Sequence, residues 1–222
     1  MSYTYRVSSL GSAFLHMWRA WRILVPVIVV NTIVQAITVW PPYTYGSQVW
    51  TVVSAIVSGC VMWIAFGVMC AAALAVADGT VQWRGVLRML RTNGIRYVLW
   101  SLCWGVAVAI GLALFVIPGI IIIAMTCFLA LAVLDGQTTP LLVNLRVIGR
   151  RFWRWLITST IVVLVLMLAW YASGLVVFFL RPPVATLPVW LVGGWLIAWF
   201  TTAYALIYRS AVADRGSVPP EG

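Results

Sequence analysis

Four long stretches without a single charged residue constrain the fold of this chain more than any other feature. They cover residues 23–77, 97–134, 155–180 and 182–208. A helix needs about 20 apolar residues to cross the hydrocarbon core of a bilayer, so each stretch can cross once or twice. Charged residues make up only 8% of the chain, against about 25% in soluble domains. The sequence therefore predicts an all-α, polytopic membrane protein with one transmembrane domain over residues 1–222.

Turn residues divide the uncharged stretches into six predicted transmembrane spans. Trp40-Pro41-Pro42 ends the first span and Asp78-Gly79 ends the second. The stretch 97–134 has 38 residues. As one helix it would measure about 57 Å, nearly twice the hydrocarbon thickness, so we expect it to fold back at Pro118-Gly119. The predicted spans are residues 23–40, 49–77, 97–116, 120–134, 155–180 and 187–208. No cleavable signal peptide is evident, so we expect the first span to remain as an anchor.

The arginines predict the orientation of these spans. Six crossings place both termini and the loops at residues 78–96 and 135–154 on one side, which then carries 13 of the 14 arginines. Only Arg181 falls on the other side. Because basic residues accumulate in cytoplasmic loops, we expect these loops and both termini to be cytoplasmic. If Pro118-Gly119 only kinked a helix, the ratio would fall to nine to five, so the hairpin is preferred.

The net charge of +10 comes from arginine alone, because the chain contains no lysine. These arginines border apolar spans, where the anionic headgroups of phospholipids are the nearest phosphates. We therefore expect membrane lipids, and not nucleic acid, as their partners. The arginine-only, tryptophan-rich composition is typical of a GC-rich bacterial genome, which indicates a bacterial plasma membrane.

A short motif recurs after alternate spans and predicts an internal repeat. Leu-Ala-Val-Ala-Asp-Gly at residues 74–79 returns 57 residues later as Leu-Ala-Val-Leu-Asp-Gly at 131–136, and Ala-Val-Ala-Asp stands at 211–214. We expect three pseudo-repeats of about 8–78, 80–136 and 139–214, followed by a disordered tail at 215–222. Asp78 and Asp135 are then turn residues, and each can also pair with a neighbouring arginine.

Each predicted unit begins with a segment of helical periodicity. Apolar residues recur on one face at Leu141, Leu145, Ile148 and Phe152, at Leu10, Phe14, Met17 and Trp21, and at Trp83, Leu87 and Leu90. Polar side chains lie opposite, and the predicted contacts to lipid headgroups or a partner are Arg84, Arg88, Arg91, Arg146, Arg150, Arg151 and Arg154. Such helices either lie in the headgroup layer or dock a soluble partner, as coupling helices dock an ATPase.

Residues suited to catalysis are scarce. The chain has one histidine, one glutamate and three aspartates, and it lacks P-loop, GxSxG and HExxH motifs. The four cysteines have no metal or redox spacing and are expected to pack in the apolar interior. We therefore expect no enzymatic activity, no cofactor and no metal site.

The predicted spans contain no charged residue, which argues against a proton-coupled carrier but not against a passive pathway. Asn31 and Gln35 are four residues apart on one helix face, and Ser54 and Ser58 are arranged likewise. They are our candidates for a polar cavity, because an amide left unpaired in lipid is costly. The alternative is that they make contacts between packed helices.

Several short motifs resemble one bacterial family. They are Ile117-Pro118-Gly119-Ile120, residues 131–136, Leu145-Arg146, Arg151-Phe152-Trp153-Arg154 and residues 202–209. Together they resemble the YciC-like membrane proteins and the membrane domain of some glycerophosphoryl diester phosphodiesterases. The family has an acidic residue followed by Ala-Leu-x-x-Ser-Trp where this chain has residues 144–148. The resemblance implies a six-helix membrane module. The sequence contains no counterpart of the phosphodiesterase catalytic domain, so that activity is not carried over.

The sequence thus favours a non-catalytic accessory or scaffold subunit of a membrane complex, and a transport complex would fit. Its partner would be a second copy or another membrane protein. The alternative is the permease subunit of an ATP-binding cassette transporter, with residues 80–94 and 139–153 as coupling helices for a cytoplasmic ATPase. A membrane-embedded lipid enzyme would instead require Asp78 or Asp135 to be catalytic.

Overall fold

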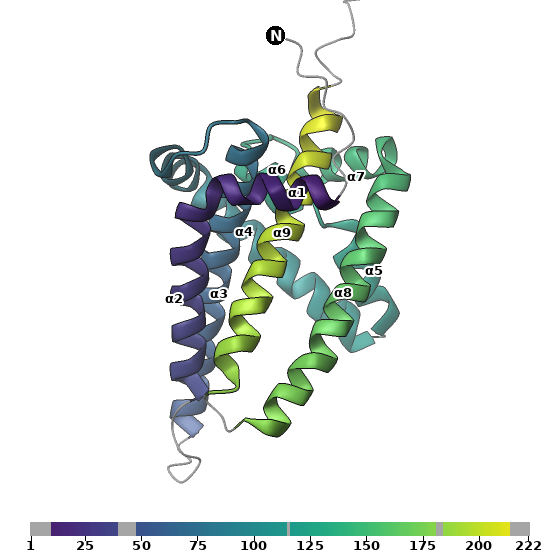
Figure 1. Cartoon of the computed structure of the whole chain (residues 1–222). Helices are drawn as coiled ribbons and strands as arrows, with labels where there is room; N and C mark the ends of the chain where they lie inside the picture. The colour runs from purple at the N-terminus through teal and green to yellow at the C-terminus, as the bar shows by residue number, and fades with distance from the viewer. Residues whose placement is uncertain (1–9, 40–47, 115, 181–183, 214–222) are drawn as a thin grey trace, which may run out of the picture.

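The computed structural model describes residues 10–39, 48–114, 116–180 and 184–213, and within them every regular element is a helix. In chain order they are α1 (Leu10–Met17), the 3-10 helix η1 (Trp18–Ala20), α2 (Trp21–Val39), α3 (Gln48–Ala77), α4 (Trp83–Leu114), α5 (Val116–Met125), α6 (Leu129–Leu134), α7 (Pro140–Arg150), α8 (Phe152–Phe179) and α9 (Thr186–Ala213). Figure 1 shows the long helices arranged as a bundle, with α1 lying across one end of it.

Among the described residues, five helical segments are long and apolar enough to cross a membrane. They are Leu10–Val39, Val49–Ala77, Trp83–Ala113, Phe152–Phe179 and Thr186–Ala213. The prediction of an all-helical protein with several membrane-spanning helices is thereby confirmed. In the first segment α1 lies across the end of the bundle, so α2 provides most of the length along the bundle axis (Figure 1).

The fourth predicted span, residues 120–134, is not one continuous helix, and this part of the prediction is wrong. The region consists of the 10-residue α5 and the 6-residue α6, separated by a turn at residues 126–128. Neither piece alone is long enough to cross a bilayer. Apolar composition predicts burial in lipid or protein, but it does not reveal an interruption that another helix stabilises.

The predicted reversal at Pro118-Gly119 lies earlier in the chain. α4 ends at Leu114 and α5 begins at Val116, so both residues fall within the first turn of α5. Proline is tolerated there because its missing N–H would have no partner inside the helix. α4 and α5 pack closely, since a methyl group added to Gly111 would lie 3.0 Å from the Gly119 Cα. α4 and α5 therefore pack against each other close to the predicted reversal, but α5 does not continue as the predicted fourth span.

α2, α3 and α9 all pack against one another, and α1 lies across their end. We call these four helices the compact unit. Residues 71–77, mostly alanine, are all buried in α3, which allows α9 to approach closely. Gly194 of α9 lies directly against Ile28 of α2, because an added methyl group would come within 2.8 Å of that side chain. Small side chains thus determine how closely these helices pack.

Two of the three predicted amphipathic segments are separate helices, α1 and α7. The third, beginning at Trp83, is continuous with the predicted third span in the single helix α4. α7 buries Val143, Val147 and Ile148 against the protein, whereas Leu141 and Leu145 of the predicted stripe are more than two-fifths exposed. Its apolar surface is therefore divided between the protein interior and the outside.

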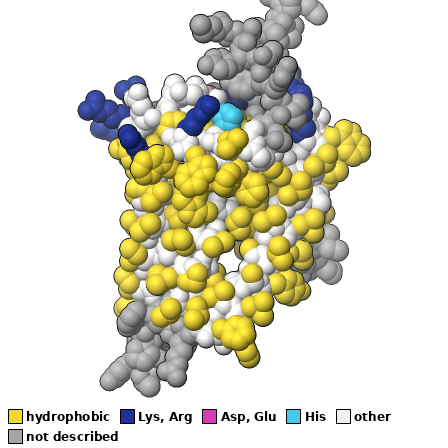
Figure 2. Space-filling view, viewed as in Figure 1, with side chains coloured by type: hydrophobic (Ala, Val, Ile, Leu, Met, Phe, Trp, Pro, Cys, Tyr) yellow, Lys and Arg dark blue, Asp and Glu magenta, His cyan; other side chains and the backbone are white. Residues whose placement is uncertain are grey.

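All described arginines lie where α2, α4 and α8 begin and α3 and α9 end, and we call this the arginine end. Figure 2 shows the basic side chains visible on one face gathered there, above a wide apolar belt. This distribution is typical of a protein whose belt faces lipid and whose charged end faces water.

Candidate functional site at the arginine end

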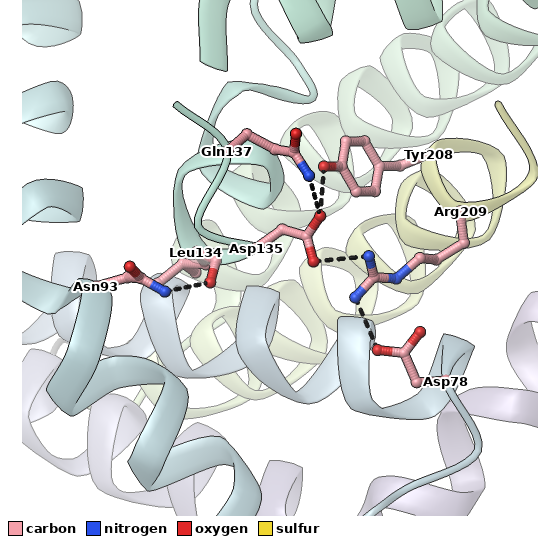
Figure 3. A network of polar contacts seen from close by, with 7 residues as sticks. All are labelled: Asp78, Asn93, Leu134, Asp135, Gln137, Tyr208 and Arg209. Carbon is pink, nitrogen blue, oxygen red and sulfur yellow. Dashed lines mark hydrogen bonds and ion pairs between the residues drawn. The ribbon is translucent and has the colours of Figure 1, made fainter. Parts of the chain in front are cut away.

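The two aspartates of the recurring motif meet on one arginine (Figure 3). Arg209 of α9 donates from Nη1 to Asp135 Oδ1 over 2.6 Å and from Nη2 to Asp78 Oδ2 over 2.7 Å. The Tyr208 hydroxyl and the Gln137 amide each donate to Asp135 Oδ2 over 2.8 Å. The Asp135 and Arg209 side chains are only 13% and 17% exposed. One guanidinium thus joins the ends of α3, α6 and α9.

The same backbone geometry ends α3 and α6. Gly79 has a φ of +71° and Gly136 a φ of +78°, in the left-handed region that favours glycine. In each cap the glycine N–H bonds to the carbonyl three residues earlier, and the next N–H bonds to the carbonyl five residues earlier. Each glycine follows an aspartate, Asp78 or Asp135, so the motif brings a carboxylate to the end of each helix.

The predicted role of these aspartates as turn residues agrees with this geometry, but their arginine partner differs from the prediction. Both share Arg209, which is 131 residues from Asp78 and 74 from Asp135. A cation is favourable there because the C-terminal ends of α3 and α6 carry partial negative charge. The network therefore joins helix ends that lie far apart in the sequence.

Further hydrogen bonds tie neighbouring helices to the same end. Asn93 Nδ2 of α4 donates over 2.9 Å to the last carbonyl of α6 (Figure 3). Arg150 Nη1 donates to the Ala211 carbonyl over 3.1 Å, and Arg151 donates to the preceding carbonyl over 3.5 Å. Carbonyls in the last turn of a helix lack intrahelical donors, and these arginines satisfy two of them in α9.

Asn144 of α7 occupies the interruption between α5 and α6. Its side chain is completely buried. Oδ1 accepts a hydrogen bond of 2.9 Å from the Phe128 N–H, and Nδ2 donates one of 2.5 Å to the Met125 carbonyl. An interrupted backbone inside an apolar region is tolerated where protein groups satisfy it. Asn144 therefore allows the chain to break its helix beside the membrane-spanning segments.

The predicted polar-cavity residues lie together only in part. Gln35 Nε2 donates to Asn31 Oδ1 over 3.4 Å and to the Ser58 carbonyl over 3.2 Å, and the Ser58 hydroxyl donates to Gln35 Oε1 over 2.6 Å. Ser54 instead donates within its own helix, to the Thr51 carbonyl. Asn31, Gln35 and Ser58 thus connect α2 to α3, which fits the alternative that these residues make contacts between packed helices.

The predicted arginine contacts fall into two groups. Arg150 and Arg151 are tied to α9, as described above. The remaining five lie on the first turns of α4 and on α7 and α8. Both described carboxylates are occupied by Arg209, so within the described residues no carboxylate pairs with Arg84, Arg88, Arg91, Arg146 or Arg154. Nor does any group of three or more His, Cys, Asp and Glu residues there lie close enough to hold a metal ion.

Comparison with family models, with curated proteins and with solved structures finds no match. The structure therefore defines the class: an all-helical protein with several helices that can cross a membrane. The resemblance to the YciC-like group stays a prediction.

Two residues central to this end are not among those that the sequence predicts. Arg209 stands next to Tyr208, immediately after an uncharged stretch, and only the recurring Asp-Gly motif hints that a shared cation is needed. Asn144 is the one amide in α7. A polar residue among the buried apolar positions of a short helix is the signal that could have identified it.

Proposed function

We propose that this chain is a non-catalytic, multi-pass protein of a bacterial plasma membrane that serves as an accessory or scaffold subunit of a larger membrane assembly. The polar network at the arginine end supports a structural role, because its hydrogen bonds and ion pairs join helices of this chain to one another. The two aspartates considered as catalytic are both engaged by Arg209.

The observation that carries the proposal is the exposure of α8. Only 6% of the residues in its most apolar window are buried, against 61% for α3 and 50% for α9. Trp155 is the one buried residue described in this 28-residue helix. A spanning helix that packs so little on its own chain offers a long apolar face to a neighbouring membrane helix. We therefore place the partner, a second copy or another membrane protein, on α8.

Site-directed photo-crosslinking in intact membranes tests this proposal. A photoreactive residue at Leu168, on the exposed face of α8, should give one discrete crosslinked band. The matched control is Val30 on α2, which is 56% exposed and also apolar. Crosslinks to lipid alone at Leu168, together with a monomeric mass in mild detergent, would contradict the scaffold role.

The same proposal includes a topology. We place both termini and the loops that contain Arg84 and Arg146 in the cytoplasm, and we treat α5 and α6 as one interrupted crossing that completes the second of three units. The shared end geometry of α3 and α6 supports this arrangement, because Asp78 and Asp135 reach the same arginine. A cysteine at Thr138 should react with impermeant maleimide only in inverted vesicles. Labelling from outside intact cells would overturn the topology.

The permease subunit of an ATP-binding cassette transporter is the second candidate, and α7 is the observation that favours it. α7 lies at the arginine end and exposes Leu141, Leu142 and Leu145 to the outside. A coupling helix requires such an apolar surface on the cytoplasmic side. Leu145→Asp should then uncouple ATP hydrolysis by a co-purifying ATPase. An ATPase that stayed bound and active in that variant would exclude this role.

A further inference from the structure

A cavity of about 410 Å³ lies among α3, α4, α5, α6, α8 and α9. It extends from the interior, where its lining residues Cys70 and Leu131 are each 1% exposed, to the outer surface, where Ile120 and Val163 are more than half exposed. Sites for small molecules typically have volumes of about 300–1,000 Å³. The cavity is therefore large enough for a ligand and continuous with the outside.

The cavity opens beside α8, toward the apolar belt of the molecule. Ser159, Val162, Val163 and Leu166 of α8 line it, together with residues of α9. The face in Figure 2 is hollowed between the side chains of these two helices, whose positions Figure 1 shows. Because α8 and α9 are both apolar enough to span a membrane, the opening faces hydrocarbon and not water.

The wall of the cavity suits an apolar ligand. Tryptophan, phenylalanine, isoleucine and valine side chains make up much of it, and several of the polar side chains among them form hydrogen bonds within the protein. Trp104 Nε1 donates to Thr126 Oγ1 over 2.6 Å, and the Ser159 and Tyr204 hydroxyls share a hydrogen bond of 2.9 Å. Cavities lined mainly by apolar side chains hold water poorly and accept apolar molecules.

Arg154 lies on α8 toward the arginine end, beyond the residues of that helix that line the cavity. It precedes Ser159 by five residues, which is about 8 Å along the helix axis and about 140° around it. Its neighbour Trp155 donates from Nε1 to Cys127 Sγ over 3.2 Å, and Cys127 lines the cavity. Both described carboxylates are held by Arg209. Arg154 is therefore available to an anion placed just above an apolar chain in the cavity.

We propose that the cavity binds an acyl chain of an anionic phospholipid, which enters between α8 and α9 and keeps its phosphate at Arg154. The apolar wall recognises the chain, and the guanidinium recognises the phosphate through charge-assisted hydrogen bonds. Phospholipid surrounds α8 in any membrane, so the ligand is present at the opening. This site does not require a scaffold role, because the cavity and Arg154 both belong to this chain.

Native mass spectrometry of the full-length protein tests the proposal. The protein is delipidated in dodecyl maltoside and titrated with dioleoyl phosphatidylglycerol or, separately, dioleoyl phosphatidylcholine. Wild type should retain one phosphatidylglycerol molecule at collision energies that remove the others. Ala124→Phe, which fills the cavity wall, should lose this molecule. Ala109→Phe is the matched control, since Ala109 is exposed on α4 and outside the cavity.

The headgroup contact is tested with a second pair of variants. Arg154→Gln should weaken phosphatidylglycerol binding about fivefold, the effect of one arginine near an anionic lipid surface, and leave phosphatidylcholine binding unchanged. Arg88→Gln, an exposed arginine at the same end, should behave as wild type.

If Ala124→Phe does not fold, Val163→Trp replaces it as the cavity variant. It narrows the opening at a half-exposed position and should also lose the tightly bound lipid. Retention of the tightly bound lipid by the folded cavity variant would overturn the proposal. The proposal would also fail if Arg154→Gln and Arg88→Gln weakened phosphatidylglycerol binding equally. It would fail as well if the wild type were found only as a lipid-free dimer.

Discussion

The helices of the compact unit and α8 are all apolar enough to span a membrane, yet they pack very differently. α3 and α9 have mean hydropathies of 2.3 and 1.5 in their most apolar windows, and α8 has 2.5. Half or more of the residues in the first two windows are buried, but almost none are in α8. Hydrophobicity therefore does not decide which helices pack together here. Residue size does, because small residues let α2, α3 and α9 approach one another whereas long aliphatic residues cover α8.

The difference in packing also separates a supporting part, the compact unit, from the other helices that surround the cavity. The compact unit is joined to α6 by the Arg209 network at one end. α8 and the α4–α5 hairpin lie around the cavity, where fewer side chains are buried. Regions with few packed contacts open most easily and are the usual location of ligand-binding elements. The following variants test whether the two parts differ in this way, from the largest expected effect to the smallest.

Removing the shared cation should have the largest effect. Arg209→Met leaves Asp135 largely buried without its ion pair, and breaking a buried pair typically costs about 3–5 kcal/mol. We expect a loss near the lower limit, since Asp78 is one-third exposed. Sodium dodecyl sulfate titration followed by tryptophan fluorescence measures the free energy of unfolding. Arg88→Met is the control, and adding Asp135→Asn to Arg209→Met should recover part of the loss. Equal stability of Arg209→Met and Arg88→Met would contradict the stabilising role of the network.

Removing the amide at the helix interruption should rank second. Asn144→Leu leaves the Phe128 N–H and the Met125 carbonyl without partners, and such a loss costs about 2 kcal/mol. Hydrogen exchange should rise at residues 126–128 and stay unchanged in α3. Leu145→Ala, an adjacent exposed position on α7, is the control. An unchanged exchange pattern in Asn144→Leu would show that the turn persists without this side chain.

Equal truncations in the two parts should differ in cost. Leu74 of α3 is 0% exposed and Leu168 of α8 is 71% exposed. Leu74→Ala should lower the free energy of unfolding by about 2 kcal/mol, because it creates a cavity among packed helices. Leu168→Ala should change it by less than about 0.5 kcal/mol, as surface substitutions usually do. The same detergent titration compares them, and similar losses would mean that α8 is packed after all.

Substitutions at two adjacent glycines of α9, Gly193 and Gly194, should have the smallest effects on stability. A methyl group added at Gly194 would meet Ile28, whereas one added at Gly193 meets nothing within 4 Å. Gly194→Ala should therefore destabilise by about 1 kcal/mol, because Ile28 is buried and branched at Cβ. Gly193→Ala should stabilise slightly, since alanine favours the helix. The thermal midpoint in detergent should shift in opposite directions, and Ile28→Val should relieve the strain of Gly194→Ala. A shift in the same direction for both would contradict the close contact.

The long helices were predictable from the sequence, because a long uncharged stretch is a property of many residues together. Uncharged stretches predict the long helices, and the Asp-Gly motif predicts where α3 and α6 end. The break at residues 126–128 was not predictable in this way. The break depends on the amide of Asn144 in α7, which lies 16 residues after Phe128. The pattern of apolar residues at 120–134 contains no information about that hydrogen bond.

The candidate site was predictable in its residue types but not in its pairings. Asp78 and Asp135 are marked by the repeat, but the shared arginine comes from α9 and is revealed only when the helix ends meet. The cavity has no sequence signature either, because its lining residues are ordinary apolar side chains from six helices.

Distance measurements between spin labels test the central comparison most directly. In a background with all four cysteines replaced, labels at Val30 of α2 and Ile64 of α3 report on the compact unit, and labels at Val30 and Leu168 report on α8. We predict one narrow distance distribution for the first pair. For the second we predict a broad distribution that narrows when phosphatidylglycerol is added to delipidated protein. Two equally narrow distributions in the absence of lipid would contradict the division of the molecule into a compact unit and an open, lipid-binding side.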